Sequence, residues 1–273
     1  MTRLAAIQMT SRDDLDTNLR QAEDLLRRAA GSGATVAVLP ENFAVFAPNV
    51  QRETAGKLER ILDVVSQWSR QMGLWIVAGS IPVLDRPDGE PVPGGRVRAA
   101  CFVFDDSGNL QARYDKIHLF DVDVPDAQSR YRESDTFEPG DAIIVIDTPA
   151  GRLGLSICYD LRFPELYLAL RRRGAEVIAV PAAFTAVTGE AHWQTLLRAR
   201  AIETQCYLVG AGQTGWHNAR RQTWGHSQIV DPWGRVLAEC PDSRPELCTV
   251  EIDPVQLAEI RMQMPLLTHR RLC

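Results

Sequence analysis

The feature that most constrains the fold of this chain is the alternation of two apolar patterns. Short runs rich in Val, Ile and Ala are typical of buried strands, and longer stretches with apolar residues three and four positions apart are typical of helices. Near the N-terminus, "RLAAIQM" predicts a strand, the spacing from Leu15 to Ala29 predicts a helix, and "TVAVL" predicts a second strand. Such alternation predicts an α/β fold with helices outside and sheet inside.

The next segments add an antiparallel element to this plan. An apolar stripe from Leu58 to Trp68 predicts a helix, and the continuously apolar "LWIVAGSI" (74–81) predicts one strand buried on both faces. The runs "RVRAACFVF" and "LQARYDK" flank the turn sequence "DDSGN", which predicts a β-hairpin and therefore mixed sheets. Residues 117–142 lack periodicity and are rich in charge and proline, so we expect a functional loop region there.

The same plan restarts in the second half of the chain. Strands are predicted at "AIIVI", "LGLSI", "EVIAVP" and "CYLVGAG", and helices at "PELYLALRRRG" and "HWQTLLRARAIET". No linker rich in Pro, Gly or Ser separates the halves. We therefore predict a single domain, residues 1–273.

Composition narrows the function classes. The chain is 45% hydrophobic and 24% charged, as in ordinary globular proteins, and its net charge of -5 gives no general attraction to nucleic acid or to an anionic membrane. No apolar run approaches the ~20 residues that cross a bilayer, and we expect a soluble cytoplasmic protein. The six cysteines and five histidines show neither C-x-x-C nor H-E-x-x-H spacing, so we expect free thiols and no metal site.

Three reactive side chains follow directly after predicted strands. Glu41 follows "VAVLP", Lys116 follows "ARYD", and Cys158 follows "LGLSI". Because sites in α/β proteins gather at the carboxyl ends of strands, these residues are placed to converge. A thiolate that attacks a carbonyl or nitrile carbon, a carboxylate that moves protons and a cation that offsets oxyanion charge form a set suited to acyl transfer.

Each of these residues also has a purely structural interpretation. Free cysteine is among the most buried residue types, so Cys158 is also consistent with a core filler. Glu41 is consistent with a helix cap and Lys116 with a solvated charge. Residue types and spacing alone leave both interpretations open.

Four colinear motifs carry a family resemblance. At "LPENF", "YDKIHLFDVDVP", "RESDTFEPGD" and "ICYDLRFPEL" the chain resembles the nitrilase superfamily of carbon-nitrogen hydrolases, and within it the Nit amidase branch. "GEAHWQTLLRARAIETQCYLVGAGQTG" and "GHSQIVDPWGRVLAE" extend the resemblance over essentially the whole chain. The resemblance implies that Glu41 is the general base, Lys116 the transition-state stabiliser and Cys158 the nucleophile, with Glu133 as a second glutamate near the lysine.

The resemblance also implies an architecture and a mechanism. The expected fold is a four-layer α-β-β-α sandwich, completed when two α-β sandwiches pack as a homodimer, with no metal or organic cofactor. The expected reaction forms a thioester on Cys158 and releases a carboxylic acid and an amine product. Its oxyanion would lie near Lys116 and the backbone N–H of Tyr159.

The substrate class follows from the same resemblance. True nitrilases tend to have Trp-Glu after the nucleophile, whereas this chain has Tyr159-Asp160, which favours an amidase. The chain looks most like Nit members that hydrolyse deaminated glutathione, and the nearest rival is ω-amidase acting on 2-oxoglutaramate. Carbamoylase and nitrilase activities are further alternatives. We expect a small anionic amide as the substrate.

An anionic substrate requires a cation and a shaped pocket. Arg162 is the first candidate because a guanidinium can bind a carboxylate through two parallel hydrogen bonds, although an ion pair with Glu165 or Asp160 fits its position equally well. Further candidate pocket residues are Phe184, Thr185 and His192, the last also consistent with a capping or packing role. Arg200 and Glu203, one turn apart on a predicted helix, are expected to form a structural ion pair.

Two other function classes compete. A papain-like dyad of Cys158 with His118 would leave Lys116 and Glu41 without roles, and the local protease signature is absent. A scaffold or binding module would keep the architecture but have an inert Cys158.

Overall fold

The computed structural model describes residues 2–241 and 243–272, and it contains two mixed β-sheets. The strands of the first sheet are β1 (Thr2–Gln8), β2 (Val36–Val38), β3 (Trp75–Val77), β4 (Ile81–Val83), β5 (Arg98–Phe104), β6 (Leu110–Asp115) and β17 (Glu246–Ile252). Those of the second sheet are β9 (Val145–Thr148), β10 (Gly151–Leu155), β11 (Val177–Ala182), β12 (Tyr207–Gly212), β15 (Gln228–Val230) and β16 (Val236–Glu239). The hairpins β7 (Asp121–Asp123) with β8 (Arg130–Arg132) and β13 (Thr214–Trp216) with β14 (Gln222–Trp224) stand apart from both sheets.

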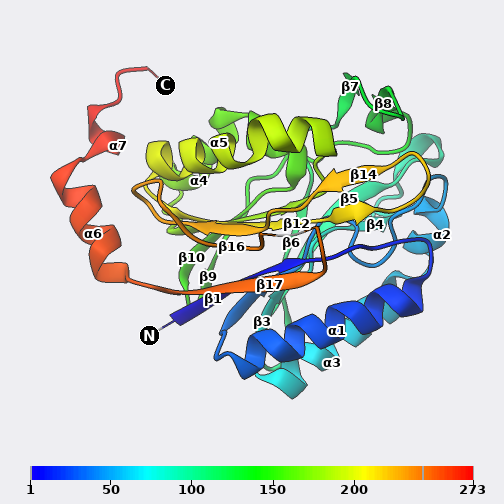
Figure 1. Ribbon diagram of the computed structural model, residues 1–273, viewed down its shortest axis with the longest axis horizontal. Coiled ribbons are helices and arrows are strands. Elements are labelled where there is room, and N and C mark those ends of the chain that lie inside the picture. Colours follow the sequence, from blue (N-terminus) through cyan, green and yellow to red (C-terminus); the bar gives the residue numbers. More distant parts are fainter. Residues whose placement is uncertain (1, 242, 273) are drawn as a thin grey trace.

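The helices of the described ranges are α1 (Leu15–Gly31), α2 (Gln51–Ala55), α3 (Leu58–Met72), α4 (Pro164–Arg172), α5 (Ala186–Thr204), α6 (Pro254–Gln263) and α7 (Leu266–His269). Helices α6 and α7 extend to one side of the sheets, towards the C-terminus (Figure 1). Short 3₁₀ turns are η1 (Pro93–Gly95), η2 (Glu133–Asp135) and η3 (Cys158–Arg162). In Figure 1, α1 and α3 lie below the sheets, and α4 and α5 lie above them.

Strand β1 shows how alternation builds these layers. Successive side chains of a strand point to opposite faces. Leu4 and Ala6 belong to one core cluster with side chains of β10 and β11 from the other sheet. Ala5 and Ile7 belong to a second cluster with side chains of α1 and α3. One face of β1 therefore packs against the second sheet and the other against helices.

The α/β class, the mixed sheets and the α-β-β-α layer order are confirmed, with one correction. The strand order is β17-β1-β2-β3-β5-β4 in the first sheet, where β6 also pairs with β5, and β16-β15-β12-β11-β10-β9 in the second. Both sheets and both helical layers come from one chain (Figure 1). The expectation that dimerisation completes the four layers is therefore wrong.

The predicted strand at 74–81 is also corrected. Strand β3 ends at Val77, β4 begins at Ile81, and the chain turns between them at Gly79, whose φ is +46°. A Cβ atom at Gly79 would lie 2.0 Å from the carbonyl oxygen of Pro40. This close approach breaks an otherwise apolar run into two strands.

Other predicted features agree with the structure. Strands β5 and β6 pair antiparallel as the "DDSGN" turn predicts, and Arg200 and Glu203 pair at 2.9 Å. In the region 117–142, the hairpin β7–β8 and η2 adjoin the cavity described below. The five described cysteines are free thiols, and Cys273 lies outside the described residues. Within the described ranges, no helix has the length and apolar character needed to cross a membrane.

Candidate active site

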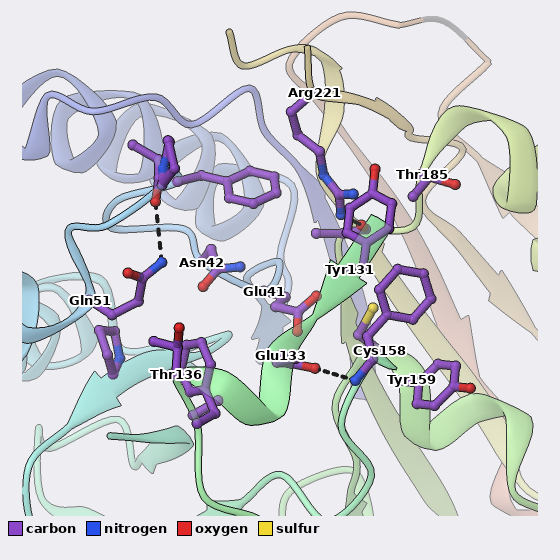
Figure 2. Close-up of a pocket in the computed structure, with 18 of the residues that line it drawn as sticks. Glu41, Asn42, Gln51, Tyr131, Glu133, Thr136, Cys158, Tyr159, Thr185 and Arg221 are labelled. Carbon is purple, nitrogen blue, oxygen red and sulfur yellow. Dashed lines mark hydrogen bonds between the residues drawn. The ribbon is translucent and has the colours of Figure 1, made fainter. Parts of the chain in front are cut away.

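The three residues that follow strands line one cavity, and Figure 2 shows Glu41 and Cys158 close to one another in it. Glu41 follows β2, Lys116 follows β6, and Cys158 opens η3 after β10. Lys116 Nζ lies 2.8 Å from Glu41 Oε1, and 2.8 and 3.0 Å from the two carboxylate oxygens of Glu133. The structure thus brings together residues that are up to 117 positions apart in the sequence, counting from 41 to 158.

Burial strengthens the interactions of this charged cluster. Lys116 is 2% exposed and Glu41 is 5% exposed. Burial acts to lower the pKa of Lys116, but the charges of Glu133 and Glu41 outweigh it and raise that pKa well above its ordinary value. Burial raises the pKa of Glu133, although the charge of Lys116 opposes this. Lys116 is therefore a fixed positive charge in the wall of the site.

Glu133 is held by its backbone surroundings as well as by Lys116. It opens η2, directly after the β7–β8 hairpin. Its Oε2 accepts a hydrogen bond of 2.6 Å from the backbone N–H of Phe120. The carboxylate therefore ties the loop that follows Lys116 to the lysine side chain.

Cys158 lies in an uncommon backbone conformation. Its φ is +48°, in the left-handed region that costs a residue with a Cβ roughly 1–2 kcal/mol. Burial raises the pKa of its thiol well above the ordinary value, and the charge of Glu41 adds to this. The charge of Lys116 and the backbone N–H of Ala183 act in the opposite direction. The resting group is therefore a thiol, with the Glu41 carboxylate beside it as a proton acceptor.

Asp160 holds the turn that carries Cys158. It is fully buried, and its carboxylate accepts hydrogen bonds from the backbone N–H of Ile157 at 2.8 Å and from the Tyr114 hydroxyl at 2.7 Å. The backbone N–H of His118 donates to its other oxygen at 3.0 Å. These contacts join the end of β10 to the segment around Lys116. The sequence pattern does not predict this role, because Tyr114 and His118 lie 46 and 42 positions before Asp160.

The position of His118 is inconsistent with a papain-like dyad. Its Nδ1 lies 2.7 Å from Asp160 Oδ1, and its ring stacks on Phe163 with centroids 3.7 Å apart. It is not among the residues that line the cavity containing Cys158. The histidine instead packs against the η3 turn, through its contacts with Asp160 and Phe163.

A cavity of about 450 Å³ opens onto the cluster. This volume is within the usual range for small-molecule sites. Of the predicted substrate-binding residues, Tyr159, Arg162, Phe184 and Thr185 line the cavity. His192 does not, and its Nδ1 lies 3.1 Å from Arg162 Nη1. His192 therefore contacts Arg162, a candidate substrate-binding residue, and does not itself line the cavity.

Arg162 is held by rings rather than by acids. No ion pair with Glu165 or Asp160 is found in the part of the chain that the structure describes. The guanidinium lies 5.0 Å from the ring centroid of Phe184 and 5.7 Å from that of Tyr159. Burial lowers the pKa of Arg162, but a guanidinium stays charged at neutral pH. The alternative of a local ion pair is therefore not observed, and Arg162 remains available to an anion.

Two cavity residues escaped the sequence analysis. Tyr131, from β8, and Arg221, from the β13–β14 hairpin, both line the cavity, and the guanidinium lies 4.7 Å from the tyrosine ring centroid (Figure 2). Neither residue directly follows a buried apolar run in the sequence. They reach the cavity because the β7–β8 and β13–β14 hairpins fold over it.

Comparisons with known proteins match this chain over most of its length. Residues 3–262 match the family described as carbon-nitrogen hydrolase. A deaminated glutathione amidase of Yersinia enterocolitica is 45% identical over 98% of this chain and 92% of its own. Yeast Nit3, described as a member of branch 10 of the nitrilase superfamily, superposes with a TM-score of 0.86 at 30% identity, over 99% of this chain and 97% of its own.

A third relative is an amidase whose own active-site cysteine has been modified. The structure of a mutant amidase from Nesterenkonia sp. AN1 shows covalent addition of the acetamide moiety of fluoroacetamide at the active-site cysteine. It superposes with a TM-score of 0.81 at 26% identity, over 99% of this chain and 94% of its own. With a family match over most of its length and these relatives, the chain belongs to the carbon-nitrogen hydrolases of the nitrilase superfamily, enzymes that hydrolyse carbon-nitrogen bonds other than peptide bonds.

Proposed function

We propose that this chain is an amidase that hydrolyses deaminated glutathione, with Cys158 as nucleophile, Glu41 as general base, and Lys116 as the cation that stabilises the oxyanion. One observation carries the proposal: the Lys116 ammonium lies between two carboxylates in the wall of a cavity that is also lined by a buried thiol. The name of the Yersinia relative, shared by others at 37–44% identity, supports the substrate.

The first step forms a covalent bond to sulfur. Because burial and Glu41 keep the Cys158 thiol protonated, Glu41 accepts the proton as the sulfur attacks the amide carbon. The carbonyl oxygen becomes an oxyanion. The Lys116 ammonium donates to Glu41 and to both carboxylate oxygens of Glu133, and its positive charge stabilises the oxyanion together with the backbone N–H of Tyr159.

The second half of the reaction regenerates the enzyme. Glu41 returns the proton to the leaving nitrogen, the carbon-nitrogen bond breaks, and the amine leaves a thioester on Cys158. Glu41 then takes a proton from water, the hydroxide attacks the thioester, and the acid departs while the proton returns to sulfur. One amide and one water give one carboxylic acid and one amine. In this mechanism Glu133 is a positioning residue, because it acts through Lys116.

The rival substrate is 2-oxoglutaramate. It shares with deaminated glutathione the keto-acid carboxylate, for which Arg162 is the proposed partner because it lines the cavity without an acid partner among the described residues. The cavity of about 450 Å³ favours the larger molecule, because the acyl part shared by the two substrates would leave much of it unfilled.

A single assay tests the proposal. Both substrates yield 2-oxoglutarate, so its release can be measured for each, beside acid release from an aliphatic amide, a nitrile and a carbamoyl amino acid. We expect the highest kcat/KM with deaminated glutathione and no turnover by Cys158→Ala with an unchanged circular dichroism spectrum. A higher kcat/KM for 2-oxoglutaramate would contradict the substrate, and a nitrile as the best substrate would contradict the amidase assignment.

We also propose that the enzyme is a homodimer. Ile202 on α5 is 46% exposed, and Trp233 before β16 and Leu237 in β16 are 49% and 43% exposed. Ile202 packs against Gly234, the residue after Trp233, and neighbouring exposed apolar side chains of this kind are typical of protein interfaces. Light scattering after gel filtration is expected to give twice the chain mass of 30.4 kDa. A monomer at micromolar concentration would contradict the proposal.

A further inference from the structure

The cations of the cavity differ in whether an acid neutralises them. Lys116 is paired with Glu41, and Arg132 is paired with Asp123 at 3.0 Å. Within the described ranges, Arg162, Arg220 and Arg221 line the cavity with no ion pair, and of these Arg220 is exposed to solvent. The cavity therefore contains two buried or half-buried guanidinium groups whose charges no acid of the described chain balances.

Arg221 is held rigidly by three contacts. Its Nη2 donates a hydrogen bond of 2.9 Å to the carbonyl oxygen of Ala183. Its guanidinium lies 4.7 Å from the ring centroid of Tyr131 and 5.5 Å from that of Phe46. Stacking of this kind fixes the plane of an arginine without neutralising its charge. Figure 2 shows the Arg221 side chain reaching down beside Tyr131 towards the labelled cavity residues.

One nitrogen of Arg221 lacks an acceptor. Among the described residues, Nη1 has no hydrogen-bond partner although it is buried. A buried donor without a partner is costly, and a charged donor more so. A ligand that supplied a carboxylate oxygen there would satisfy the donor and the charge together.

Arg221 and Arg162 flank the same short segment. Arg221 binds the carbonyl of Ala183, the residue whose backbone N–H faces the Cys158 thiol, and Arg162 stacks on the next residue, Phe184. The two guanidinium groups come from different parts of the chain, the β13–β14 hairpin and η3. Both guanidinium groups therefore adjoin the segment that faces the Cys158 thiol, and both line the same cavity.

Deaminated glutathione has two anionic groups. One carboxylate belongs to the keto acid that stays on the enzyme as the acyl group, and the other ends the cysteinylglycine leaving group. The leaving group of 2-oxoglutaramate is ammonia, which has no carboxylate. A second guanidinium is therefore of use only to a substrate with an extended anionic leaving group.

We propose that Arg221 binds the terminal carboxylate of the peptide leaving group and makes the enzyme select such amides over primary amides. This inference rests on the proposed function and deepens it. It makes Arg221 a specificity-determining residue, whereas Arg162 serves every substrate that carries the keto acid.

The test combines a residue change with a substrate change. Arg221→Gln is compared with the wild type on deaminated glutathione, on its analogue with an amidated C-terminus, and on 2-oxoglutaramate. We expect kcat/KM for deaminated glutathione to fall roughly 10- to 100-fold in Arg221→Gln, as for loss of a charge-assisted hydrogen bond. The wild type is expected to lose a similar factor on the amidated analogue, and Arg221→Gln to treat acid and amide alike.

The remaining measurements separate the possible outcomes. For 2-oxoglutaramate, kcat/KM is expected to change less than about threefold in Arg221→Gln, and Arg27→Gln, on the exposed face of α1, controls for the loss of one positive charge. An equal loss on all three substrates would overturn the proposal, because Arg221 would then only position Ala183. An unchanged kcat/KM for deaminated glutathione would also overturn it. Failure of the proposed function looks different, since the wild type would then turn over none of the three substrates, or would turn over 2-oxoglutaramate with a higher kcat/KM than deaminated glutathione.

Discussion

At the scale of single residues, the site depends on a buried group of three charges. Glu41, Lys116 and Glu133 carry one positive and two negative charges in a region from which water is largely excluded. Removing one partner of a buried ion pair costs more than the pair contributes, because the remaining charge is left without compensation. Lys116 should therefore matter to stability as well as to turnover.

Lys116→Met is expected to lower the free energy of unfolding by roughly 3–5 kcal/mol, because Glu41 and Glu133 would then face one another without a cation. Turnover should fall at least 100-fold, as for the loss of an oxyanion donor. Urea unfolding and kcat give the two values. Lys57→Met removes an exposed pair with Glu53 and should change the unfolding free energy by less than about 0.5 kcal/mol.

The double variant Lys116→Met with Glu133→Gln separates the two effects. It removes one negative charge and should recover part of the lost stability without recovering turnover. If turnover returned together with stability, Lys116 would have only a structural role. If the single variant were as stable as the wild type, the buried charges would not be coupled as described.

His217, beside the cavity, sets a pH dependence of stability. Burial lowers its pKa to about 4, and its Nδ1 lies 2.6 Å from the carbonyl oxygen of Ser11. Between the ordinary pKa of about 6.5 and this lowered value, the unfolded chain binds the proton and the folded chain does not. Stability should therefore fall as the pH drops through this window, by up to about 3 kcal/mol.

The contribution of His217 is measured by comparison. Urea unfolding of the wild type and of His217→Asn between pH 7 and pH 4.5 should show a smaller pH slope for the variant. Subtraction removes the shared titration of the carboxyl groups. Equal slopes for the two proteins would contradict the prediction, because the pKa of His217 would then be the same in the folded and the unfolded chain.

At the scale of elements, apolar patterning predicted where most strands lie but not where they break. The hairpin β5–β6 follows from its turn sequence, and Glu41, Lys116 and Cys158 were found because each follows a strand. The break at Gly79 depends on the Pro40 carbonyl, which lies 39 positions earlier in the sequence and touches it only in the folded chain. Contacts between distant segments, such as those of Asp160, leave no local pattern.

Gly79→Ala tests whether this turn positions the general base. The new methyl group would overlap the Pro40 carbonyl, directly before Glu41, so we expect a loss of stability of roughly 2–4 kcal/mol and a lower kcat. Gly73→Ala is the matched control, because Gly73 also has a positive φ, +59°, but a Cβ there meets nothing within 4 Å. It should cost about 1 kcal/mol and leave kcat unchanged. Equal effects of the two substitutions would show that the turn does not support Glu41.

At the scale of the whole molecule, the layer order came from the family resemblance, because alternating patterns do not reveal how many sheets a chain forms. One core cluster contains side chains from both sheets, including Leu4, Val38 and Val103 from the first and Leu155 and Val180 from the second. Neither sheet can lose its partner without exposing this apolar surface to water. The two sheets should therefore unfold together.

We expect one cooperative transition in urea, with the same midpoint by far-UV circular dichroism and by tryptophan fluorescence. Trp68 and Trp75 report on the first half of the chain, and Trp193 reports on α5. Such coincidence would support the predicted single domain. Two separated midpoints would show that the halves are independent units.

The central claim is that Cys158 forms a thioester during turnover, and mass spectrometry of the acid-quenched enzyme tests it most directly. Wild type and Glu41→Gln would be mixed with deaminated glutathione, quenched within one turnover and digested. We predict an adduct on the peptide that contains Cys158, with the mass of the keto-acyl group, in the wild type, and no adduct in Glu41→Gln, because that variant lacks the base that starts the attack. Turnover by the wild type without an adduct, or with the acyl group on another residue, would contradict the account.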